Sequence, residues 1–221
     1  MISKITNPDF TTEEKKMAVI SIIVASIILY LPGRILPHIV PHFNFSIDGV
    51  MLVIITTIAM HALLVIILIC LNRKRLLSDF KEIKVKTIVI ALIATVLALV
   101  CNFATHIIFT DQGSNQEAAN ATVEASKWLM LIPTVFLAPF GEELYTRLSF
   151  RALCKNPVIY VIISAFAFWL LHETFTIGGI SYFLLGIIWA AAYVKSKNIF
   201  TTVIAHFLNN AISFSLMAFA G

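Results

Sequence analysis

Charged residues occur inside one otherwise apolar stretch of this sequence, at 128–150, where Glu142, Glu143 and Arg147 lie close together. If the stretch is helical, Glu143 and Arg147 are four residues apart and can form an ion pair. This pair is expected to hold the helix in register. Glu142 is rotated by about 100° from its neighbour and points elsewhere. An unpaired carboxylate shielded from water is a candidate general base, able to activate a water molecule.

Two further apolar stretches each carry a pair of residues at the same four-residue spacing. Phe168 and His172 end one stretch, and His206 and Asn210 lie within the other. His172 can share a water molecule with Glu142 and orient it. His206 and Asn210 can donate hydrogen bonds to an oxyanion, a contribution of about 2.7–4 kcal/mol per donor in a well-studied hydrolase. Polar groups on three apolar helices are most cheaply accommodated if they converge on one interior site.

Alternative readings of these residues stay open. Glu142 could be a helix-end carboxylate near the lipid headgroups, and His172 an interfacial histidine. His206 and Asn210 could be hydrogen-bonding links between helices. Pro139 and Gly141, just upstream of the glutamates, can kink the first helix and open its backbone.

A metal site is the rival chemistry. Glu142, His172 and His206 form a set of two imidazoles and one carboxylate, as at catalytic zinc sites. However, the His-Glu-x-x-His pattern is absent, because Thr176 stands where its second histidine would be. Gly-x-Ser-x-Gly and Gly-x-Gly-Asp are absent too, which argues against serine and aspartyl chemistry. We favour metal-independent glutamate chemistry without a cofactor and keep zinc as the alternative.

The composition places these residues in a membrane protein. Hydrophobic residues make up 59% of the 221 and charged residues only 13%, with a mean hydropathy of +0.93. Soluble domains carry about 25% charged residues. The net charge of +4 includes no basic run with interleaved aromatics, so nucleic acid is not an expected partner.

Hydropathy predicts an all-α membrane protein, a bundle of about seven transmembrane helices (six to eight). The apolar runs lie at about 17–36, 49–71, 87–110, 128–150, 157–172, 179–194 and 199–219. The first run is longer than the 7–15 residues of a signal-peptide core, so it is expected to be retained. We expect a short cytoplasmic tail over 1–16 and one membrane domain over 17–221. Its motif-bearing core spans about 128–219.

The distribution of basic residues predicts the orientation. With the N-terminus in the cytoplasm, 14 of the 16 Lys and Arg residues fall inside, and only Arg34 and Lys127 fall outside. This agrees with the excess of positive charge in cytoplasmic loops of membrane proteins. The acidic loop at 111–126 is then outside.

The three motifs together resemble those of the CAAX protease and bacteriocin-processing family, which includes the type II CAAX prenyl endopeptidases. The matching patterns are Glu142-Glu143-x-x-x-Arg147, Phe168-x-x-x-His172 and His206-x-x-x-Asn210, in order and each in an apolar stretch. They cover 138–210, about a third of the chain, and the first 125 residues show no matching motif. The resemblance implies an intramembrane peptidase that acts at a polar cavity in the bundle.

The function expected from these observations is an intramembrane endopeptidase in the bacterial plasma membrane, with its active site toward the cytoplasmic half. Its partners are the bilayer and a membrane-associated peptide or protein, such as a bacteriocin leader, a signalling peptide or a C-terminal segment. The alternative is a non-catalytic membrane partner, such as a bacteriocin self-immunity or regulatory protein. The sequence does not specify the substrate or the oligomeric state.

Overall fold

A computed structural model describes residues 10–39, 49–108, 124, 126–172 and 179–219 of the chain. These residues form helices joined by short turns, with no strand among them. Most of the predicted 1–16 tail and of the acidic 111–126 loop, and Thr176 after His172, lie outside the described residues. The all-helical prediction is confirmed for the part of the chain that is described.

The helices follow the seven apolar stretches predicted from hydropathy. The fourth stretch forms one continuous helix over 126–153, in which two π-helical segments interrupt the α-helix. The elements are α1 (Thr12–Ile39), α2 (Gly49–Lys81), α3 (Val85–Ile108), η3 (Ile132–Leu137), α5 (Ala138–Glu143), η4 (Leu144–Ser149), α6 (Phe150–Leu153), α7 (Pro157–His172), α8 (Ile180–Ser196) and α9 (Ile199–Phe219). Helix α2 continues ten residues beyond the predicted stretch, where an Arg75–Asp79 pair at helical spacing supports it.

The outer surface of the bundle is apolar, as a lipid-facing surface requires. Three described helices are long and apolar enough to cross a membrane: Met51–Lys81, Val85–Ile108 and Ile199–Phe219. Along α3, Ala94 and Ala98 are buried while Val100 and Phe103 are 60% and 69% exposed. Small residues inside and large apolar residues outside are typical of packed membrane helices. The fold therefore indicates a membrane protein.

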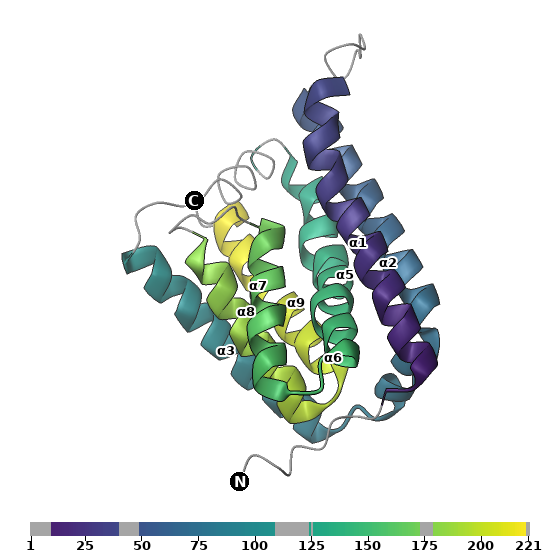
Figure 1. Cartoon of the computed structure of the whole chain (residues 1–221). Helices are drawn as coiled ribbons and strands as arrows, with labels where there is room; N and C mark the ends of the chain where they lie inside the picture. The colour runs from purple at the N-terminus through teal and green to yellow at the C-terminus, as the bar shows by residue number, and fades with distance from the viewer. Residues whose placement is uncertain (1–9, 40–48, 109–123, 125, 173–178, 220–221) are drawn as a thin grey trace.

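The helix over 126–153 and α9 lie inside the bundle (Figure 1). Helices α1 and α2 pack side by side along one flank, and α3 covers α8 and α9 on the other. Helix α7 packs mainly on α8. Two of the three motifs thus lie on the inner helices, and the Phe168–His172 motif lies on α7 beside them.

Two glycines let helices approach closely beside the site. A Cβ at Gly186 on α8 would lie 2.7 Å from the Cα of Ala165 on α7, closer than real Cβ atoms come. A Cβ at Gly141 would lie 3.1 Å from the side chain of Leu64 on α2. Gly141, considered above only as a helix breaker, therefore serves the contact between α5 and α2.

A polar cluster joins three helices at the end of the bundle that the sequence predicts to be cytoplasmic. Nε of Arg75 lies 2.9 Å from a carboxylate oxygen of Asp79, and Arg75 NH1 lies 3.8 Å from Glu14 on α1. The other Asp79 oxygen accepts the N–H of Ile199 at 3.1 Å, and Asn198 donates to the Asp79 carbonyl at 2.6 Å. Asp79 thereby caps the start of α9 and fixes that helix to α2.

Candidate active site

The helix that carries the two glutamates is wound more widely on either side of them. In η3 the N–H of Ala138 donates to Pro133 O, five residues back. The next bond of this series would need an N–H at Pro139, which proline lacks. The carbonyl of Thr134 is therefore available, and Asn210 on α9 donates to it through Nδ2 at 3.0 Å. Proline at this position thus creates an acceptor for a motif residue from another helix.

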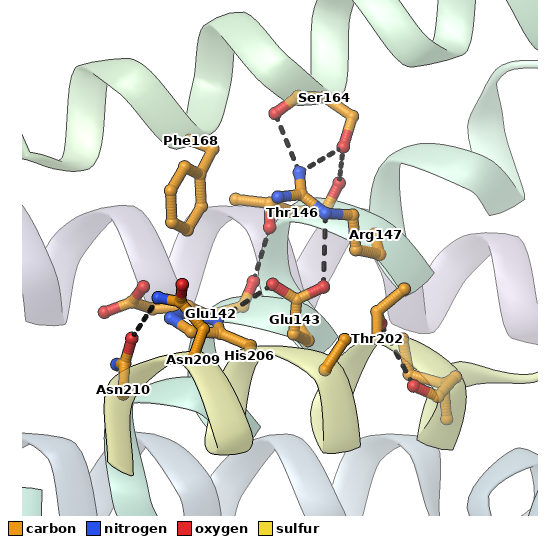
Figure 2. A network of polar contacts seen from close by, with 12 residues as sticks. Glu142, Glu143, Thr146, Arg147, Ser164, Phe168, Thr202, His206, Asn209 and Asn210 are labelled. Atoms are coloured by element: carbon orange, nitrogen blue, oxygen red, sulfur yellow. Dashed lines mark hydrogen bonds and ion pairs between the residues drawn. The ribbon is translucent and has the colours of Figure 1, made fainter. Parts of the chain in front are cut away.

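Glu143 is completely buried and joins two of the three motifs. Its Oε2 lies 3.1 Å from Nε of Arg147, and its Oε1 lies 3.1 Å from Nδ1 of His206 on α9 (Figure 2). Arg147 NH1 donates to the hydroxyl of Ser164 at 2.6 Å and to its carbonyl at 3.1 Å. The predicted Glu143–Arg147 pair is present, and α7 supplies a further partner that the spacing did not reveal.

Glu142 points away from this pair and toward α7. Its Oε2 lies 3.5 Å from Nε2 of His172, and this oxygen has no hydrogen-bond donor among the described residues. Nδ1 of His172 lies 3.0 Å from the carbonyl of Phe168. Because a carbonyl only accepts, Nδ1 carries the proton and Nε2 of the neutral ring is an acceptor. When Glu142 is ionised, Glu142 and His172 therefore face each other with two acceptor atoms.

The backbone of Glu142 is tied to α7 through a short relay. The hydroxyl of Thr146 donates to the Glu142 carbonyl at 2.6 Å. The hydroxyl of Ser164 donates to the Thr146 carbonyl at 2.6 Å. Ser164 also accepts from Arg147, so this one buried serine connects both glutamates to α7 (Figure 2).

Both histidines lie against aromatic rings supplied by α8. The ring of Trp189 stacks on His206 with centroids 4.0 Å apart, and that of Tyr182 stacks on His172 at 4.4 Å. Phe168 lies between them, 4.5 Å from His172 and 5.2 Å from Trp189. Phe168, from the second motif, therefore contacts both His172 and Trp189. Trp189 and Tyr182 belong to no motif, so their role was not visible in the spacing.

The predicted site residues therefore fall into three adjoining contacts. Glu142 faces His172, Glu143 binds His206, and Asn210 reaches η3. Among the described residues, no three His, Cys, Asp or Glu side chains form a group arranged to hold a metal ion. His206 engages Glu143 through Nδ1 rather than meeting Glu142.

The arrangement defines a helical membrane protein with carboxylate–histidine pairs buried between its central helices. Residues 124–212 match the family model described as Rce1-like, type II CAAX prenyl endopeptidase Rce1-like. The match runs from the start of the glutamate-bearing helix into α9 and includes all three motifs. The resemblance inferred from those motifs is thereby confirmed for this segment. Searches of curated proteins and of solved structures found no match for the chain.

Proposed function

We propose that this protein is an intramembrane endopeptidase that hydrolyses a peptide bond of a membrane-associated protein or peptide. The family match over 124–212 supports the reaction class. The observation that carries the chemistry is the contact between Glu142 and His172, a buried carboxylate and an imidazole 3.5 Å apart. Glu142 is not the partner of Arg147, because Glu143 forms that ion pair.

Two acceptors at this separation suit a water molecule that donates one hydrogen to each. Such a water is bound through both hydrogens to Glu142 Oε2 and His172 Nε2, and its lone pair is free. The water oxygen attacks the peptide carbonyl carbon while Glu142 takes its proton. The carbonyl π bond opens, and its electron pair moves to the oxygen to form a tetrahedral oxyanion.

We assign stabilisation of this oxyanion to His206 and Asn210. Nδ1 of His206 faces Glu143, so Nε2 is the ring nitrogen left for the substrate. For Nε2 to donate a hydrogen bond, the ring must be protonated on both nitrogens, and the Glu143 carboxylate supplies the countercharge. One Nδ2 hydrogen of Asn210 is donated to Thr134 O, and the second is left for the oxyanion. Hydrogen-bond donors that are in place before the reaction stabilise an oxyanion most strongly in a site shielded from water.

The intermediate then collapses. The carbonyl re-forms, the C–N bond breaks, and the leaving amine takes the proton held by Glu142. Glu142 returns to its ionised form, so the cycle consumes one water and needs no external acid or base. Arg147, Ser164 and Phe168 keep the glutamates and histidines in place without touching the reacting atoms.

We further propose that the protein resides in a bacterial plasma membrane with its N-terminus in the cytoplasm. The distribution of 14 of its 16 basic residues supports this orientation. Its substrates would be leader or signalling peptides, or short C-terminal segments, held at the membrane surface. A non-catalytic immunity or regulatory partner is the competing account.

The test is cleavage of a panel of tagged membrane peptides by the protein in proteoliposomes. Wild type is expected to cleave at least one peptide, and His172→Ala to lose that activity. The control is His106→Ala, which alters an exposed histidine on α3 that belongs to none of the three motifs. If wild type and His172→Ala give the same cleavage, or none, across the panel, the result favours the non-catalytic account.

A further inference from the structure

Three asparagine side chains form a continuous chain of hydrogen bonds from the flank of the bundle to the glutamate-bearing helix. Asn102 on α3 donates through Nδ2 to Oδ1 of Asn209 on α9, at 3.2 Å. Asn209 donates to Oδ1 of Asn210 at 3.2 Å. Asn210 in turn donates to Thr134 O at 3.0 Å. This series of bonds thus connects three helices and ends at Thr134, four residues before α5 begins.

The direction of all three bonds is fixed from one end. A side-chain amide can in general be turned over to exchange its oxygen and nitrogen. The Thr134 carbonyl can only accept, so the Asn210 amide must direct Nδ2 toward it. Oδ1 of Asn210 then requires a donor, which is Asn209 Nδ2, and Oδ1 of Asn209 requires the donor that Asn102 supplies. Asn102 is therefore the residue that completes the series.

Removing the first donor would leave Asn209 with an unpaired oxygen. Asn209 is 3% exposed, so water cannot readily replace the lost partner. The Asn209 amide would then gain by rotating toward another donor, which withdraws its Nδ2 from Asn210. The Asn210 amide would be held at one end only, by Thr134.

We propose that Asn102 is a positioning residue that holds the Asn210 amide in the orientation needed for oxyanion stabilisation. This inference rests on the proposed function, which assigns the second Nδ2 hydrogen of Asn210 to the oxyanion. It also gives α3 a role in the site, although no motif lies in the first 125 residues of the chain. Elsewhere α3 covers α8 and α9 through small and β-branched residues.

The experiment is a double-mutant cycle on cleavage kinetics in proteoliposomes, with wild type, Asn102→Leu, Asn210→Ala and the double variant. Asn210→Ala is expected to lower kcat by about 10²- to 10³-fold, as loss of an oxyanion donor does. Asn102→Leu, which keeps the side-chain size, is expected to lower kcat by about 10- to 100-fold with KM unchanged. The double variant should be no slower than Asn210→Ala, because Asn102 acts through Asn210.

A control separates positioning from packing. Thr105→Val removes a buried hydroxyl from the same helix. Among the described residues that hydroxyl bonds only to carbonyls of α3 itself, so kcat should not change. If Asn102→Leu does not fold, Asn102→Gln retains a donor and should keep a measurable fraction of kcat. Wild-type kcat in a folded Asn102→Leu, or losses that multiply in the double variant, would overturn the inference. Full activity in Asn210→Ala would instead overturn the oxyanion assignment in the proposed function.

Discussion

Nδ1 of His206 lies 3.1 Å from Oε1 of Glu143, inside the bundle and far from that residue in sequence. The other oxygen of the same carboxylate lies 3.1 Å from Nε of Arg147. One buried carboxylate therefore fixes the position of α9 relative to the glutamate-bearing helix. It also leaves Nε2 as the His206 ring nitrogen that does not contact Glu143. Glu143, the second glutamate of the first motif, thus links that motif to His206 of the third.

This network predicts that Arg147→Leu is strongly destabilising. The variant removes the arginine partner of the buried Glu143 carboxylate, and breaking a buried pair costs about 3–5 kcal/mol. Unfolding in detergent, followed by circular dichroism, would measure the effect. The matched control is Lys84→Ala, which breaks an exposed ion pair with Glu82 and should leave the unfolding midpoint unchanged. Equal midpoints for the two variants would contradict the account.

The close approach of α7 and α8 predicts that Gly186→Ala is destabilising. The added methyl would lie 2.7 Å from Ala165 Cα, a backbone atom that cannot rotate away. Overpacking of this kind costs about 1–3 kcal/mol. Gly49→Ala is the control, because a Cβ there meets no atom within 4 Å. The prediction fails if the two variants unfold at the same denaturant concentration.

The stacking of Trp189 on His206 predicts a catalytic effect from a residue outside the motifs. Trp189→Leu removes the flat surface that holds the imidazole and should lower kcat by about tenfold or more. Trp189→Phe keeps an aromatic face and should retain most of the activity. Trp128→Leu, at a tryptophan that is 67% exposed, should have no effect on kcat. A Trp189→Leu enzyme as fast as wild type would show that the stack does not position His206.

The proposed orientation predicts opposite labelling at two exposed positions. In a background with Cys70, Cys101 and Cys154 replaced by alanine, Glu82→Cys should be shielded from an impermeant thiol reagent in intact cells. Glu124→Cys should react with it. The three natural cysteines are free in the structure, so their replacement breaks no disulfide. The reverse pattern would place the N-terminus outside.

Much of the fold could be predicted because a segment that crosses lipid must be apolar and must satisfy its own backbone hydrogen bonds, as a helix does. Apolar stretches located the helices to within a few residues, apart from α2, whose charged end continues the helix past the apolar run. The spacing of Glu143 and Arg147 sufficed for their pairing, since both lie on one helix. The meeting of Glu142 with His172 followed from the motifs, because a chain turn at Pro157 brings both to one level.

Other contacts of the site carry no signal in a single sequence. Ser164 lies in an apolar helix, and its bond to Arg147 depends on how α7 is rotated. Counting residues from the Lys197 turn places His206 about 8–9 Å shallower than Glu142 for straight helices at 1.5 Å per residue. The structure nevertheless brings His206 to Glu143, beside π-helical segments that straight-helix counting ignores. The Asn102–Asn209 bond likewise joins residues 107 positions apart.

The most direct test of the central claim compares wild type with Glu142→Gln, each with and without a strong chelator, on a peptide that wild type cleaves in proteoliposomes. Glutamine keeps the shape of the side chain but cannot take the proton of an attacking water. The account predicts cleavage by wild type that is indifferent to chelation, and none by Glu142→Gln. Cleavage by Glu142→Gln at the wild-type rate, or loss of wild-type activity on chelation with rescue by zinc, would contradict it.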